Sequence, residues 1–244
     1  MDARVAARFA ARFAPAGPLD GSYLMDGLQE HLLELVSDSV PLVVEETGFE
    51  VVSPVTPKVL SRAEWATANV DPMLALLDPL LERAAQRPGG MGGVGRAVYG
   101  PMLGAQLGVV LGFLSQRVLG QYDVLMGGSG EVWFVGPNIV LTERRLGFVP
   151  RDFRLWVVLH ELTHWAQFEG IPWLRNHFLS LVQGLLDSLD LGPRSWMTHL
   201  LEAVRNPDHG VPLGVRILDA AQRENFERIQ AFMSVVEGHG NFVM

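Results

Sequence analysis

One short run of residues has the types and spacing expected of a catalytic zinc site. His160 and His164 are four positions apart, inside a stretch whose apolar periodicity predicts a helix. Residues four apart lie one turn above each other on a helix, so both imidazoles can bind one metal ion. Glu161 lies about a quarter-turn round from them, where its carboxylate can reach water on the metal without being a ligand. The run therefore predicts Zn²⁺ as cofactor and Glu161 as a catalytic base.

A catalytic zinc ion of this kind needs a third protein ligand, and several downstream residues are candidates. Glu237 is preferred because it follows the apolar run 233–236 and precedes Gly238, which allows a neighbouring helix to approach closely. His239 is the alternative, either as third ligand or as a catalytic donor to a transition-state oxyanion. The other candidates are Glu169, His177, Asp187, Glu202, Glu224 and Glu227.

Two other interpretations of the same residues remain open. The histidines could be core residues that hydrogen-bond to neighbours, beside an unrelated glutamate. Alternatively, the protein could be a binding scaffold in which four protein ligands, including both Glu237 and His239, close a structural metal site, or in which the metal has been lost. Three protein ligands with one open position would instead favour an enzyme.

Composition limits the class of partner and the compartment. The chain has 244 residues with 48% hydrophobic, a net charge of −8 and a pI near 5.3. The acidic balance and the lack of a Lys/Arg cluster argue against nucleic acid as a partner. Zero cysteine excludes disulfides and thiol chemistry, and no secretory signal is evident, so a cytoplasmic protein is expected. We expect one domain over 1–244, or else a helical subdomain over 1–95 and a catalytic part over 96–244.

Two segments raise the question of a membrane. Residues 1–13 form an amphipathic pattern with Arg4, Arg8 and Arg12 on one face, which predicts a helix that docks on the body of the protein or, less favoured, binds a membrane surface. Residues 97–116 carry no charge and contain a glycine every fourth position from Gly100 to Gly112. Such a ladder occurs in membrane helices, but we favour a buried central helix, so a membrane association is not expected.

The remaining pattern predicts a mainly α, α+β fold with a short β-hairpin or small sheet before the metal-binding helix. Residues 20–36 have helical spacing, residues 41–52 are an apolar run of uncertain type, and Ser61 with Glu64 predicts a capping box. A helix is expected from residue 71 to about 86, a Gly-rich loop over 88–95 and a turn over 121–130. Strands are expected over 131–135 and 138–142, then helices over 173–191, 195–204 and 218–236 with a polar loop over 206–212.

Several of these segments together resemble a known family. They are Trp65–Asn69, Leu119–Asp123, Pro137 with Asn138, the run from His160 to Phe168 with residues 172–174, and residues 236–239. The chain resembles an actinobacterial and chloroflexal family of zincin-like proteins assigned as zinc-dependent metallopeptidases, some of them labelled as associated with coenzyme F420 biosynthesis.

The resemblance implies zinc at His160 and His164, Glu161 as general base and Glu237 as third ligand. It also implies hydrolysis of a peptide or amide substrate within a zincin-like, mostly helical fold. Members of the family usually continue beyond the Glu-Gly-His segment, whereas this chain stops at Met244, so either the chain is shorter than its relatives or a tail is missing from this sequence. Neither the substrate nor the oligomeric state follows from the resemblance.

Overall fold

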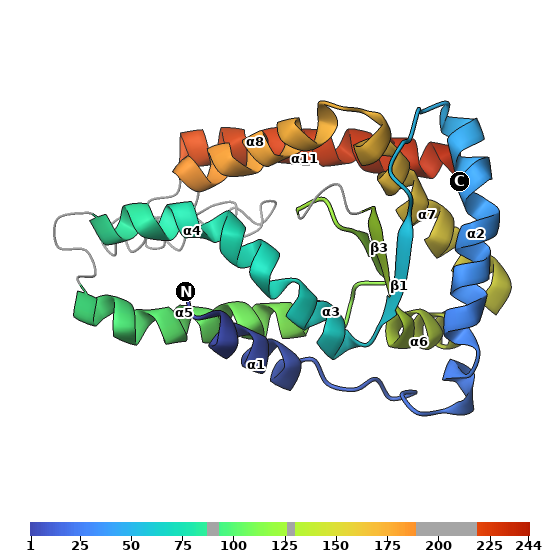
Figure 1. Cartoon of the computed structure of the whole chain (residues 1–244), viewed down its shortest axis with the longest axis horizontal. Coiled ribbons are helices and arrows are strands. Elements are labelled where there is room, and N and C mark those ends of the chain that lie inside the picture. Colours follow the sequence, from blue (N-terminus) through green and yellow to red (C-terminus); the bar gives the residue numbers. More distant parts are fainter. Residues whose placement is uncertain (87–92, 126–129, 189–218) are drawn as a thin grey trace, which may run out of the picture.

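The computed structural model describes residues 1–86, 93–125, 130–188 and 219–244, and Figure 1 shows mainly helices around a small sheet. This confirms the predicted fold class. The predicted elements over 195–204 and 206–212, residues 88–92 of the predicted loop and the candidate ligand Glu202 lie outside the described residues. The described helices are α1 (Ala3–Phe13), the short 3-10 helix η1 (Tyr23–Met25), α2 (Leu28–Thr47), α3 (Arg62–Ala68), α4 (Val70–Gln86), α5 (Gly93–Leu114), α6 (Gly136–Leu146), α7 (Pro150–Gly170), α8 (Leu174–Ser188) and α11 (Ala220–Val243).

The sheet has three described strands in the order β1-β3-β2: β1 (Thr56–Leu60), β3 (Glu131–Val135) and β2 (Gly120–Tyr122). β3 pairs parallel with β1 and antiparallel with β2. Its side chains alternate between two apolar cores, with Val132 and Phe134 in one and Trp133 and Val135 in the other. The strand predicted over 131–135 is confirmed. β1 was not predicted, and its Pro57 is tolerated because β1 is an edge strand.

The prediction of a second strand over 138–142 is wrong, because these residues lie in α6. Pro137 falls in the first turn of this helix, where its missing N–H costs nothing. Asn138 is buried, and its amide donates to the carbonyls of Ser115 at 2.7 Å and Val118 at 2.6 Å. Its Oδ1 accepts from Arg62 Nε at 2.6 Å. These tertiary hydrogen bonds outweigh the β-propensity of the aliphatic residues that follow.

Helix α7, which carries His160, Glu161 and His164, packs against α2 over the larger core. α2 continues through Pro41 and ends at Gly48 with φ 64°, so the first part of the apolar run 41–52 is helical. A buried ion pair fixes the start of α7, because Arg154 donates to both carboxylate oxygens of Glu143 at 2.7 and 3.0 Å. The same guanidinium lies 3.0 Å from His31 Nδ1 on α2. One bidentate arginine thus joins α2, α6 and α7.

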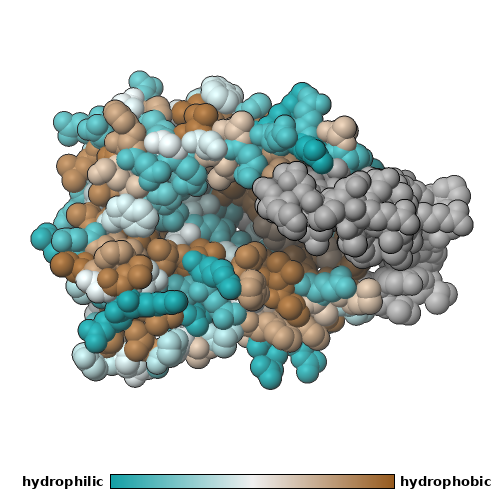
Figure 2. All heavy atoms as spheres, turned by 180° about the vertical axis from the view of Figure 1, so that it is seen from behind, coloured by the Kyte–Doolittle hydropathy of each residue, from teal (hydrophilic) through white to brown (hydrophobic). Residues whose placement is uncertain are grey.

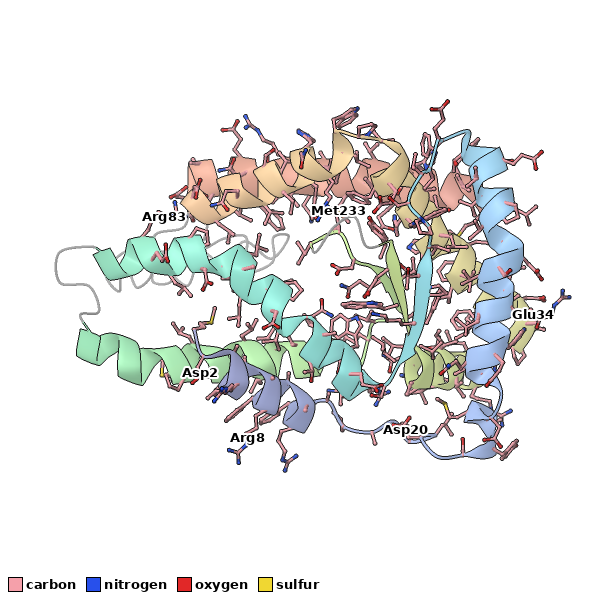
Figure 3. The ribbon with its side chains drawn as sticks, in the orientation of Figure 1. Asp2, Arg8, Asp20, Glu34, Arg83 and Met233 are labelled. Atoms are coloured by element: carbon pink, nitrogen blue, oxygen red, sulfur yellow. The ribbon has the colours of Figure 1, made fainter. Side chains whose placement is uncertain are left out.

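The glycine ladder of α5 packs against α1. A Cβ added to Gly104 would lie 2.5 Å from the carbonyl oxygen of Asp2, and one added to Gly112 would lie 2.6 Å from the backbone of Phe13. The glycines therefore allow the two backbones to touch, with α1 lying beside α5 (Figure 1). The docking predicted for α1 is confirmed, and Arg8 points away from the body (Figure 3).

The described residues contain no helix with the length and apolar character to cross a membrane. On the face shown in Figure 2, hydrophobic and hydrophilic residues are interspersed.

The remaining helices frame the site. The capping box of Ser61 and Glu64 is confirmed at the start of α3, and α4 follows from Val70. α8 and α11 lie side by side (Figure 1). α11 was predicted to end near residue 236 but continues to Val243, so Glu237 and His239 are helical residues.

The close contact between α1 and α5 makes a testable prediction. Gly108→Ala would place a Cβ against the backbone of Ala6 and Ala10, so we expect it to lower the free energy of unfolding by about 1–3 kcal/mol. A Cβ at Gly100 in the same helix meets nothing within 4 Å, but Pro101 follows and disfavours the helical conformation for a preceding residue that has a Cβ. This cost offsets the higher helix propensity of alanine, so Gly100→Ala should change the free energy of unfolding by less than about 0.5 kcal/mol. Urea denaturation measures both, and a destabilisation of equal size at the two positions would contradict the packing described.

Candidate metal centre

Three side chains from two helices converge at one point. His160 and His164 of α7 bring their Nε2 atoms to 3.1 Å from each other. Glu237 of α11 places Oε2 at 3.5 Å from His160 Nε2 and Oε1 at 3.6 Å from His164 Nε2. One ligand atom from each of these residues lies within 4.8 Å of the others, and among the described residues no further group of three or more His, Cys, Asp or Glu converges in this way.

The geometry and chemistry of this cluster fit zinc. When ligand atoms lie about 2.0–2.1 Å from a tetrahedral zinc ion, they are separated from each other by roughly 3.3 Å. The observed separations of 3.1, 3.5 and 3.6 Å are close to that value, with the last two measured to different oxygens of Glu237. Two imidazoles and one carboxylate are also a ligand set of catalytic zinc sites, with the fourth position left open. No Cys is present to provide a softer site.

Gln167 orients His164 and ties α7 to α11. Its Nε2 donates to the carbonyl of Val236 at 2.9 Å, and this carbonyl can only accept, so the orientation of the amide is fixed. Gln167 Oε1 then faces His164 Nδ1 at 3.0 Å and accepts a hydrogen bond from its N–H group. His164 is thereby held with the lone pair on Nε2, which is the atom that points at the cluster. Gln167 was not predicted from the sequence, although its place one turn after His164 on the same helix face is a signal for a residue that contacts this histidine.

The Nδ1 side of the His160 ring is held by packing rather than by a hydrogen bond. Its ring stacks on Trp156 with the centroids 5.7 Å apart, and its buried Nδ1 has no hydrogen-bond partner among the described residues. Burial, reinforced by the charge of His164 and opposed by Glu237, lowers the pKa of His160. A lowered pKa favours the neutral imidazole, which is the form that binds a metal ion.

Glu161 is buried beside the cluster, with 6% of its surface exposed. Burial first, and then the charge of Glu237, raises the pKa of Glu161 to about 8, against a hydrogen bond with the backbone of Tyr122. Strand β2 makes room for this carboxyl, because a Cβ on Gly120 would lie 2.5 Å from Glu161 Cγ. A cation held by the neighbouring ligands would oppose the rise in pKa and favour the carboxylate.

The other predicted residues lie apart from the three convergent ligands. His239 accepts from Gln167 Nε2 at 2.9 Å and stacks on Phe49, with the ring centroids 5.6 Å apart. It therefore touches the residue that orients His164, and its roles as third ligand or oxyanion donor stay predictions. Glu169 accepts from the Tyr122 hydroxyl at 2.6 Å, Asp187 pairs with Arg83 and Glu224 pairs with Arg228. His177 lies against Trp173 and Phe232, and Glu227 is exposed.

A cavity of about 280 Å³ opens onto His160, Glu161, His164 and Glu237. Backbone and side chains of β2, α7, α8 and α11 line it, so four elements that are distant in sequence meet there. Its other lining residues are Gly120, Gln121, Tyr122, Val124, Phe168, Phe178, Met233 and Val236. A substrate in this cavity would lie beside both the convergent ligands and the Glu161 carboxyl.

Comparison with known proteins agrees with this site. Residues 1–244 match the profile of a family described as zincin-like metallopeptidase. The chain is also similar to a crystal structure from Chloroflexus aurantiacus, described as a candidate hydrolase with a novel fold, at 33% identity and a TM-score of 0.70. The match covers 100% of this chain and 68% of the other. No match was found among curated proteins. The association with coenzyme F420 biosynthesis stays a prediction.

Gln167 offers a test of the site that does not depend on turnover. Gln167→Leu removes the acceptor that fixes the His164 tautomer, so we expect zinc affinity to fall about 10–100-fold. Gln230→Leu, on the exposed face of α11, is the matched control and should leave affinity unchanged. Competition with a chromophoric chelator measures both. Equal affinities for the Gln167 variant and the native chain would show that the hydrogen bond does not position His164.

Proposed function

The chain belongs to the zincin-like metallopeptidase family, and on that premise we propose that it is a zinc-dependent metallopeptidase acting on a peptide or amide. In this proposal His160, His164 and Glu237 hold the metal ion, and Glu161 is the general base. The observation that carries it is the convergence of two imidazoles and a carboxylate within 4.8 Å beside a buried glutamate.

The proposed chemistry assigns the proton transfers to Glu161. Bound zinc supplies a Lewis acid that polarises the substrate carbonyl and makes water more acidic. Glu161 takes the proton from the attacking water and later delivers it to the leaving nitrogen. The contact with Gly120 and the hydrogen bond with the Tyr122 backbone hold this carboxyl in place for both steps.

The edge of β2 supports an extended peptide as the substrate. The Leu119 carbonyl and the Asp123 N–H bond to β3, so by the alternation of an antiparallel pair the backbone groups of Gly120 and Tyr122 face away from it. Both residues line the cavity beside Glu161. A peptide lying along this edge would pair with the backbone of Gly120, because the Tyr122 N–H bonds to Glu161 and the Tyr122 carbonyl accepts from Val124 N at 3.1 Å. The peptide carbonyl would then come close to the convergent ligands.

A structural metal site is the alternative function, and the described residues favour the enzyme. A structural zinc ion is usually held by four protein ligands. Only three His, Asp or Glu ligand atoms converge among residues 1–86, 93–125, 130–188 and 219–244, and their cluster opens onto the cavity. A chain without cysteine is compatible with the cytoplasm, which we propose as the place of action.

Replacement of the general base separates chemistry from metal binding. We expect Glu161→Gln to lower kcat by at least about 100-fold and to retain one equivalent of zinc, because the amide cannot carry the proton. Glu227→Gln, an exposed site on α11, is the control and should keep full activity. Peptide hydrolysis and elemental analysis on the same samples give both values. Full activity in the Glu161 variant would overturn the assignment.

A second pair of variants decides between Glu237 and His239 as third ligand. Glu237→Gln should weaken zinc binding strongly, since it removes a charged donor that lies 3.5 and 3.6 Å from the two imidazoles. His239→Ala should weaken zinc binding less, because its contact with the site runs through Gln167. Isothermal titration with zinc ranks the two, and the reverse order would make His239 the ligand.

A further inference from the structure

The cavity beside the convergent ligands has one chemically distinct wall. Beyond His164, the next turn of α7 presents Phe168, and α8 and α11 add Phe178, Met233 and Val236. Met233 lies midway along α11, on the side that faces the sheet (Figure 3). We refer to these four residues as the apolar wall. It stands next to the residues to which chemistry is assigned, so a side chain adjoining the reacting amide can contact it.

The aromatic side chains of the apolar wall contact one another and neighbouring rings. Phe168 stacks on Tyr122 with centroids 5.7 Å apart and lies 6.2 Å from Phe178, which in turn stacks on Phe232 at 5.5 Å. Yet Phe168, Phe178 and Met233 are only half-buried, so part of their apolar surface is available to a ligand in the cavity. A site that is already ordered loses little entropy when it binds an apolar group.

The described lining of the cavity has no cationic lysine or arginine to pair with an acidic side chain. The nearby Arg175 donates to the backbone carbonyls of Val124 at 2.8 Å and Leu125 at 3.1 Å, and the Tyr122 hydroxyl donates to Glu169. An acidic substrate side chain placed against the apolar wall would lose its hydration without forming an ion pair.

We propose that the apolar wall is a specificity site for a large apolar side chain, of the size of Leu, Met or Phe, next to the scissile amide. This inference rests on the proposed hydrolysis of peptides. The cavity volume of about 280 Å³ is close to the lower end of small-molecule pockets, roughly 300–1,000 Å³, and is enough for one such side chain with its backbone.

A set of chelators with the same metal-binding group tests the apolar wall without requiring turnover. The probes are acetohydroxamate and a hydroxamate that carries an isobutyl or benzyl group, titrated by calorimetry into the zinc-loaded full chain. Burial of the apolar group predicts at least about tenfold tighter binding of the second probe. A third probe carrying a carboxymethyl group should gain nothing over acetohydroxamate. A binding ratio near one for the isobutyl or benzyl probe would overturn the proposal.

Variants identify the residues that determine the binding ratio, which is the affinity of the isobutyl or benzyl probe divided by that of acetohydroxamate. Phe178→Ala should reduce it to within about threefold of one, whereas Trp173→Ala, which removes a 62% exposed aromatic residue outside the cavity, should leave it unchanged. Met233→Gln keeps the length of the side chain and should also reduce the binding ratio. This second variant tests the proposal if Phe178→Ala does not fold. Its control is Val235→Gln, at a position 72% exposed on the same helix. An unchanged ratio in the folded cavity variants would contradict the proposal.

Failure of this inference can be distinguished from failure of the proposed function. Zinc content is measured on every sample, and cleavage of a random peptide library is read by mass spectrometry. Cuts that adjoin large apolar residues support both proposals, and cuts that adjoin small or charged residues overturn the specificity alone. A high hydroxamate ratio with no cut peptide supports the apolar wall and overturns the peptidase. A chain that binds no zinc overturns both.

Discussion

The arrangement of the site depends on one contact between helices that are far apart in sequence. Gln167 of α7 donates to the Val236 carbonyl and to His239 on α11, and accepts from His164. Both the oxygen and the nitrogen of this amide are hydrogen-bonded, so the amide fixes the position of α11 along α7. Glu237, the next residue after Val236, is thereby placed beside the two imidazoles. The same contact therefore sets both the tautomer of one proposed ligand and the position of another.

The rest of the fold supplies a firm base for that contact. α7 is held at its start by the buried pair of Arg154 and Glu143 and along its length by α2. The sheet places the backbone of Gly120 against Glu161, since β2 is held by pairing with β3. β3 supplies side chains to both apolar cores, so we propose that residues 1–244 fold as one domain rather than as parts 1–95 and 96–244.

The sequence was most informative where the chemistry depends on local spacing. His160, Glu161 and His164 follow from the helical repeat, and the apolar run before Glu237 was enough to select it among several acids. The role of Gln167 was missed because its partners are on another helix. The strand expected over 138–142 became a helix because buried hydrogen bonds of Asn138, made with residues more than fifteen positions away, outweigh local propensity.

X-ray absorption spectroscopy of the zinc-loaded chain tests the central claim most directly, because it counts and identifies the atoms bound to the metal ion. The geometry of His160, His164 and Glu237 predicts two imidazole nitrogens, one carboxylate and one exchangeable oxygen from solvent, with one imidazole lost in His164→Ala. Four protein ligands would contradict a catalytic site and indicate a structural one. A spectrum unchanged by His164→Ala would show that zinc binds elsewhere.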